Sequence, residues 1–166
     1  MCAKKTVVFL DIDGVLNREH INYGDDDWPV CCHEPKLCAN LQSILDKAGA
    51  EIVVSSAWRE DDDLKSRLPI ILAGWGIGHM PVGYTTTDSL LVCKLSDHLW
   101  YAKNRASQIL QYVSEHTLGT WIAIDDLPLP LPDEHFVHTH PRFGLTQQKA
   151  VEAIDKLTRN SNNVTI

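Results

Sequence analysis

The stretch that decides the fold is Val7-Val8-Phe9-Leu10-Asp11-Ile12-Asp13-Gly14-Val15. Its four leading apolar residues predict a strand over residues 6–10 that is buried on both faces, as in a parallel sheet. Asp11 follows at the carboxyl end, where ligands bind in open α/β sheets. Alternate side chains share a face, so Asp11 and Asp13 can approach one site, and Gly14 allows a sharp turn. Two carboxylates together favour a divalent cation as counter-charge, although a plain Asp-Gly turn has the same sequence.

The composition predicts one globular domain over residues 1–166, because the chain is 44% hydrophobic and 22% charged. Its formal net charge of −7 argues against broad non-specific binding to nucleic acid or anionic membrane. We see no apolar run of membrane-spanning length and no signal-peptide core at the start. The five cysteines show no disulfide pattern. We therefore expect a soluble cytoplasmic protein with reduced thiols, no membrane partner and no obligatory protein partner.

Apolar periodicity predicts strands that alternate with helices along the chain. This alternation implies parallel β-α-β units with right-handed crossovers. The polar residues 17–30 are interpreted as a flap, and Pro69 is expected to restart a helix that begins near Asp61. The expected strands cover residues 6–10, 51–54, 77–84, 120–124 and 136–138, and the other helices begin near Pro35, Arg105 and Thr146.

Hydroxyl groups follow the second apolar strand, where Val54 runs into Ser55 and Ser56. At a strand end such hydroxyls can donate hydrogen bonds to a phosphoryl oxygen. A helix cap or turn is an equally ordinary role for a Ser-Ser pair.

Charged residues mark two further places. The strand that ends at Ile124 is followed by Asp125 and Asp126, and adjacent acids are costly to hold together without a cation, unless one of them caps a turn. Lys103 and Arg105 precede this strand, at the expected start of a helix. Either cation can neutralise a bound anion or simply be solvated.

In order and spacing these signals resemble the four motifs of the haloacid dehalogenase (HAD) superfamily, from Val7 to Asp126. Residues 10–17, 54–59 and 144–146 are also similar to the small stand-alone HAD domains related to those of Swiss-Army-knife RNA repair proteins. The resemblance implies a three-layer α/β/α Rossmann-like fold with a mainly parallel central sheet. It also implies no large cap domain, since residues 57–102 leave room for a small insertion only.

The activity that this resemblance implies is a Mg²⁺-dependent phosphatase, a phosphoric monoester hydrolase. Asp11 would be the nucleophile and would form an aspartyl-phosphate. Asp13 would be the general acid and base, and an Asp at this position favours phosphatase over dehalogenase. Ser56, or alternatively Ser55, would bind a phosphoryl oxygen, with Gly14 beside it in the substrate site.

The charge-balancing groups are implied in the same way. Arg105, or alternatively Lys103, would balance the charge of the phosphoryl group. Mg²⁺ would be held by Asp11, by Asp13 through its backbone carbonyl, and by Asp125 or Asp126. The list of metal residues is therefore Asp11, Asp13, Asp125 and Asp126.

Other interpretations stay open. The chain could be a catalytically silent HAD-fold binding module, or a phosphotransferase to an acceptor other than water. Cys31-Cys32-His33 with Cys38 matches no standard zinc-finger spacing, and His135, His138 and His140 are interpreted as surface or rim histidines. The expected substrate is a phosphorylated small molecule or a nucleic-acid end, on whose rings Trp28 and Trp58 could stack.

Overall fold

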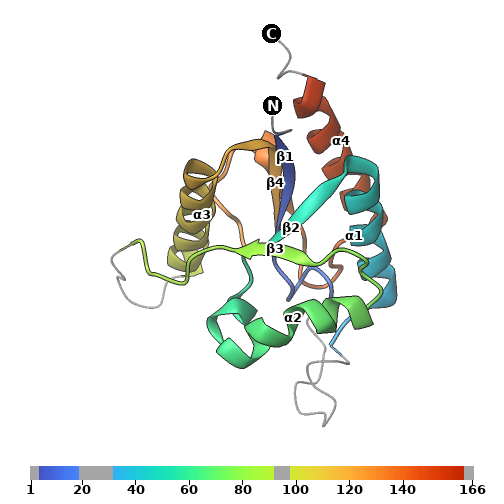
Figure 1. The fold of residues 1–166 in the computed structure, drawn as a ribbon, viewed down its shortest axis with the longest axis horizontal. Coiled ribbons are helices and arrows are strands. Elements are labelled where there is room, and N and C mark those ends of the chain that lie inside the picture. Colours follow the sequence, from blue (N-terminus) through green and yellow to red (C-terminus); the bar gives the residue numbers. More distant parts are fainter. Residues whose placement is uncertain (1–3, 19–31, 92–97, 163–166) are drawn as a thin grey trace.

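The computed structural model describes residues 4–18, 32–91 and 98–162, which form a three-layer α/β/α fold (Figure 1). The described chain contains one sheet of five strands in the order β3-β2-β1-β4-β5, and every neighbouring pair is parallel. The strands are β1 (Lys5–Leu10), β2 (Ala50–Val54), β3 (Pro81–Tyr84), β4 (Leu118–Asp125) and β5 (Phe136–His138). The expected Rossmann-like fold class is therefore confirmed.

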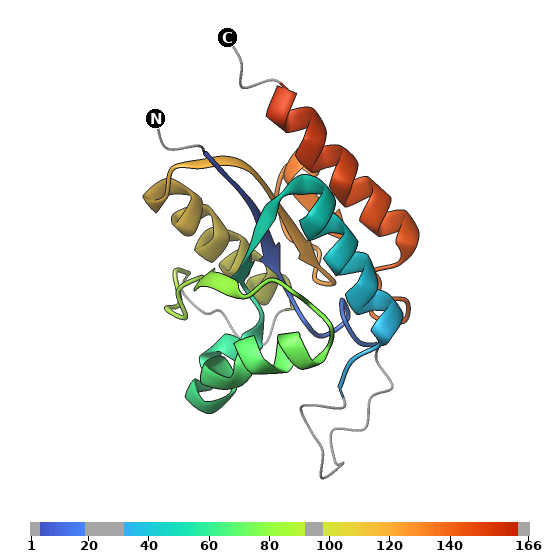
Figure 2. The ribbon, with the colours of Figure 1, turned by 45° about the vertical axis from the view of Figure 1, so that its right-hand side comes forward.

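Four helices surround the sheet in the described chain (Figures 1 and 2). One of them, α3, covers one face, while α1 and α4 lie side by side on the other. The remaining helix, α2, lies beyond the carboxyl ends of the strands. Their bounds are α1 (Pro35–Ala48), α2 (Asp62–Gly74), α3 (His98–Glu115) and α4 (Gln147–Asn162), with 3-10 turns at Ala57–Glu60 and Asp133–His135.

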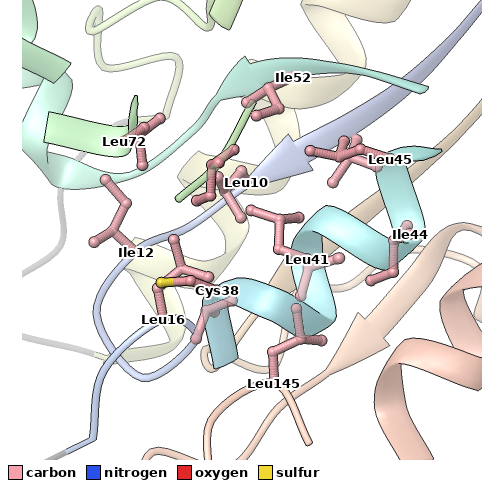
Figure 3. Packing of buried hydrophobic residues seen from close by; sticks show 14 of the residues in the cluster. Leu10, Ile12, Leu16, Cys38, Leu41, Ile44, Leu45, Ile52, Leu72 and Leu145 are labelled. Carbon is pink, nitrogen blue, oxygen red and sulfur yellow. The ribbon is translucent and has the colours of Figure 1, made fainter. Parts of the chain in front are cut away.

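Strand β1 is buried on both faces, as its sequence predicts. Leu10 packs in one apolar cluster with Leu41 and Leu45 of α1 (Figure 3). Phe9, the next residue along the strand, packs in a second cluster with Ile109 of α3. Alternation along a strand sends successive side chains to opposite faces, so each face of the sheet receives its own helix layer.

Several helix ends lie where the sequence predicts them. Pro35 stands in the first turn of α1, and Gly49 ends this helix with a left-handed φ of 59°. Thr146 precedes α4, and its Oγ1 accepts a hydrogen bond from the Lys149 amide at 3.3 Å. In the described ranges, no helix has both the length and the apolarity needed to cross a membrane.

The prediction that Pro69 restarts a helix is wrong, since α2 runs unbroken through it. A proline has no N–H to donate to the carbonyl four residues earlier, which here belongs to Lys65. The Tyr84 hydroxyl donates to that carbonyl at 3.3 Å instead. Tertiary structure therefore supplies the partner that the helix itself lacks.

Two expected boundaries are also wrong. Helix α3 begins at His98, so Arg105 lies about two turns inside it and not at its start. Buried Ala102 extends the apolar stripe of this helix toward its N-terminus. Strand β3 starts only at Pro81, because the Gly78 amide donates to Oε1 of Gln42 on α1, at 2.7 Å, and not to the sheet.

Candidate active site

Three polar side chains form a row at the carboxyl ends of β2, β1 and β4. Leu10 pairs with Val54 on one side and Ile124 on the other, which puts Asp11 level with Ser55 and Asp125. The ladder continues past the strand ends, where the Asp11 amide donates to the Ile124 carbonyl and the Ser55 amide to the Leu10 carbonyl, both at 3.0 Å. By alternation all three side chains point to the α3 face.

Arg105 of α3 meets this row. Its Nη1 lies 3.1 Å from Oδ2 of Asp11 and 2.8 Å from Oδ2 of Asp125. Only 14% of its side chain is exposed. Burial alone would lower the pKa of Arg105, but the two carboxylates outweigh burial and raise it. The guanidinium therefore stays charged and bridges the ends of two strands.

Burial and mutual repulsion raise the pKa values of the acids at the end of β4. The pKa of Asp125 is raised to about 8, mainly by burial and then by the charge of Asp11, although Arg105 opposes the change. The same causes raise the pKa of Asp126 to about 6. The single positive charge of Arg105 thus does not balance the negative charges of the carboxylate cluster.

The aspartates Asp11, Asp125 and Asp126 each offer one oxygen, and these oxygens lie within 4.8 Å of one another. In the part of the chain that the structure describes, this is the one group of acidic, His or Cys side chains that could hold a metal ion. Gly14 is required beside it, because its φ is +72° and a Cβ there would lie 2.4 Å from Oδ2 of Asp126. An all-oxygen set of this kind suits Mg²⁺ or a similar hard cation.

The Asp13 carboxylate is not one of those three aspartates, and two side chains donate hydrogen bonds to it. Nδ2 of Asn17 donates to its Oδ1, and Nε1 of Trp58 donates to its Oδ2, both at 2.8 Å. Asn17 also accepts the Gly14 amide at 2.9 Å, so it closes the turn that carries Asp13. The metal role predicted for Asp13 concerns its backbone carbonyl and is not tested by these side-chain contacts.

It was not predicted from the sequence that Asn17 and Trp58 hold Asp13, since Asn17 was given to the flap and Trp58 a stacking role on the substrate. Asn17 was assigned to the flap, yet it belongs to the turn after β1; residues 19–30 of that flap lie outside the described residues. Trp58 is 5% exposed and contacts Trp75 edge to face at 5.9 Å, so its ring is not open for stacking on a substrate. Trp28 lies outside the described residues.

The remaining predicted residues are separated by the fold. The Ser55 side chain is fully buried, and its Oγ has no hydrogen-bond partner among the described residues. Oγ of Ser56 accepts the Trp58 amide at 3.4 Å, as a cap of the following 3-10 turn. Lys103 is exposed, whereas Arg105 contacts the acids. The geometry favours Ser55 and Arg105 over their alternatives.

Arg59 has a structural position that the sequence did not reveal. Its side chain is 2% exposed, and its guanidinium donates to the carbonyls of Ser55, Ser56, Thr85 and Thr86. A fifth hydrogen bond, of 2.7 Å, reaches Oε1 of Gln108 on α3. Arg59 therefore ties the loop after β2 to the end of β3 and to the helix that carries Arg105.

The alternative metal ligands do not gather in the described ranges. Cys32 and Cys38 are buried, and Cys31 lies outside the described residues. His135 stacks on Trp121 with ring centroids 4.0 Å apart. Nε2 of His138 hydrogen-bonds to the Asp126 carbonyl at 2.9 Å, next to the aspartate cluster.

The fold has three layers around a parallel sheet. An Asp-x-Asp turn follows β1, an arginine of α3 faces it, and a second pair of acids lies at the end of β4. Together these features define a HAD-type hydrolase domain. A family model described as the HAD domain in Swiss Army Knife RNA repair proteins matches residues 7–150, and the chain belongs to this family. No curated protein matches the chain.

Proposed function

We propose that this protein is a Mg²⁺-dependent phosphomonoesterase that forms an aspartyl-phosphate on Asp11. The observation that carries the proposal is the division of labour between two carboxylates at the end of β1. Asp11 belongs to the acid cluster and lies 3.1 Å from Arg105, while the Asp13 carboxylate accepts hydrogen bonds from Trp58 and Asn17. These different partners support a proposal in which Asp11 attacks and Asp13 exchanges protons.

In the first step, an Asp11 oxygen bonds to phosphorus and the ester P–O bond breaks. Asp13, in its acid form, gives its proton to the leaving oxygen. In the second step, the Asp13 carboxylate takes a proton from water, and the water oxygen bonds to phosphorus. The bond between phosphorus and the Asp11 oxygen then breaks, which releases inorganic phosphate and restores Asp11.

Positive charge and hydrogen bonds position the phosphoryl group between these acids. Arg105 faces Asp11 from α3, and the unpartnered Ser55 hydroxyl stands level with it on β2. Asp11, Asp125 or Asp126, and the Asp13 carbonyl would hold Mg²⁺. When bound, this ion supplies positive charge at the phosphoryl oxygens. Such a transfer depends mainly on positioning and electrostatics.

The test is hydrolysis of p-nitrophenyl phosphate by the wild-type chain and by D11N, with Mg²⁺ and after EDTA treatment. We expect turnover that needs Mg²⁺ and falls to background in D11N, because the amide keeps the size of the side chain but not its nucleophilic charge. Full turnover by folded D11N, or after complete metal removal, contradicts the mechanism. Absence of turnover with any phosphomonoester would favour the binding-module interpretation.

The proposed substrate class is a nucleotide or a nucleic-acid end. The family description supports it, since it places such domains in RNA repair proteins. The net charge of −7 limits how many phosphates the surface can neutralise, so contacts beyond the reactive phosphate should be few.

A further inference from the structure

A cavity of about 490 Å³ opens beside the turn that carries Asp13. Its lining residues come from or next to the N-terminal ends of α1 and α4. These two helices lie on the face of the sheet opposite α3 (Figure 2). The size of the cavity is in the range of small-ligand sites. It is lined by Leu37 and by side chains that carry charge, hydrogen-bonding groups or an aromatic ring, namely Arg18, Glu34, Lys36, Asn40, Phe143, Thr146 and Gln147.

Residues at the cavity are connected to the catalytic turn by a peptide bond and by a backbone hydrogen bond. Arg18 directly follows Asn17, the residue that holds Asp13. On the other wall, the Leu145 amide donates to the Val15 carbonyl at 2.8 Å. Since Asp13 protonates the leaving oxygen, the leaving group extends to the side of the phosphorus that Asp13 occupies. The cavity therefore adjoins the path of the leaving group.

Phe143 presents an aromatic ring at the rim of this cavity and is 60% exposed. Its turn is closed by hydrogen bonds from the Phe143 and Gly144 amides to the His140 carbonyl, both at 2.8 Å. Gly144 has a φ of +62°, and a Cβ there would lie 2.4 Å from Cδ1 of Leu37 and 2.9 Å from the Val15 carbonyl oxygen. The backbone of the turn thus lies close to the catalytic loop, and the exposed ring projects from it.

Two cations, Arg18 and Lys36, also line the cavity. Arg18 hydrogen-bonds to Glu34 through Nε, a contact that does not use its terminal nitrogens. Lys36 is exposed in the first turn of α1. An aromatic face with nearby cations is the combination that binds single-stranded nucleic acid, because bases stack on rings and phosphates pair with cations.

We propose that this cavity is a subsite for the second nucleotide of a nucleic-acid strand whose terminal phosphate lies at Asp11. The base stacks on Phe143, and the internucleotide phosphate faces Arg18 and Lys36. The inference rests on the proposed phosphatase function and adds its specificity. Because the net charge of −7 limits further phosphate contacts, recognition ends at this second unit.

The kinetic test is a length series of one, two, three and six nucleotides, each with the same terminal phosphate, made as RNA and as DNA. We expect kcat/KM to rise mainly between one and two units. In F143A the ratio of kcat/KM for the dinucleotide to that for the mononucleotide should fall by about 5- to 100-fold, the worth of one stacked base. F143W should keep the ratio, and L110A, which removes an exposed side chain of α3, is the matched control.

A binding test separates the subsite from the chemistry. A labelled, terminally phosphorylated trinucleotide is titrated into D11N and into the double variant that carries D11N and F143A. The Kd should be higher for the double variant, by the factor by which F143A lowers the kcat/KM ratio. If the wild type shows no turnover but this difference in Kd persists, the phosphatase proposal fails and the subsite stands. If mononucleotides are hydrolysed and F143A changes neither the ratio nor the Kd, the subsite is overturned and the phosphatase stands. If neither turnover nor Phe143-dependent binding is found, both fail.

Discussion

At the scale of single residues, the proposed proton-transfer role of Asp13 depends on the hydrogen bonds that Trp58 and Asn17 donate to its carboxylate. Trp58 donates from a buried indole at 2.8 Å, so W58F removes one hydrogen bond while keeping an aromatic ring. We expect about a tenfold loss or more with alkyl phosphates, whose leaving oxygen needs a proton. The loss should be smaller with p-nitrophenyl phosphate, whose leaving group departs without one.

The comparison between leaving groups is the informative measurement for W58F. W121F is its matched control, because it also removes a buried indole but from the apolar cluster under α3. A merely structural defect would lower the turnover of both substrates by the same factor. Equal losses for alkyl and p-nitrophenyl phosphates would therefore contradict the positioning role of Trp58.

The two serines after β2 give the second prediction at this scale. Ser55 stands level with Asp11, while Ser56 caps the following turn. S55A should lower kcat/KM by about 100- to 1,000-fold, because one hydrogen bond to the phosphoryl group is lost in the transition state. S56A should act mainly on stability, by about 0.5–2 kcal/mol as for other lost caps. Both variants are compared by kinetics and by thermal unfolding. If S56A loses activity and S55A loses only stability, Ser56 and not Ser55 binds the phosphoryl group.

At the scale of elements, the sequence predicted what strand periodicity and strand order determine. Asp11 and Asp125 follow apolar runs directly, and parallel strands end at one edge, so their meeting was predictable. The choice between Ser55 and Ser56 was not, because it depends on strand register. A one-residue shift moves a side chain to the other face of the sheet.

Contacts between distant elements were also beyond sequence reasoning. Arg59 is a charged residue, which is typical of the surface, yet it is buried under β3 and α3. The hydrogen bond from Tyr84 to the Lys65 carbonyl likewise allows α2 to continue through Pro69. Such partners come together only in the folded chain, and no local pattern marks them.

Arg59 gives the prediction at the element scale. R59M would remove five hydrogen bonds to buried or partly buried acceptors in the loops after β2 and β3 and on α3, of which the Ser56 carbonyl keeps its bond from the Arg59 amide. We expect a loss of about 3 kcal/mol or more in the free energy of unfolding, measured by urea denaturation. R67M is the matched control, since Arg67 is exposed and pairs only with Asp63 one turn away. Its loss should stay below about 0.5 kcal/mol, and equal effects of the two variants would contradict the structural role of Arg59.

At the scale of the whole molecule, the acid cluster should link stability to pH and to metal. Burial, and then the charge of Asp11, raise the pKa of Asp125 to about 8 and that of Asp126 to about 6 in the folded chain. The unfolded chain has ordinary carboxyl pKa values near about 4. Between these limits the folded state binds more protons than the unfolded state. Without metal, these two groups must therefore cost stability as the pH rises from about 4 to about 8.

Carboxyl groups with lowered pKa values act in the opposite direction but in another pH range. The pKa of Glu152, for example, is lowered chiefly by hydrogen bonds and charges from Lys149 and Lys156, against its partial burial. Its contribution is present above its unfolded pKa near about 4.3 and is lost in more acidic solution. The slope between pH 5 and pH 8 therefore reports on the cluster and not on such surface pairs.

The last prediction is that the melting temperature of the metal-free chain falls between pH 5 and pH 8 by about 5 °C or more. A cation that replaces the missing protons binds the folded state better as the pH rises, so the stabilisation by 10 mM Mg²⁺ should grow over the same range. The double variant D125N, D126N is the control, because it has neither carboxylate and should lose most of both effects. Differential scanning fluorimetry in EDTA and in Mg²⁺ measures them. If the Mg²⁺ shift is the same at pH 5 and pH 8, or persists in the double variant, these aspartates are not the groups that hold the ion.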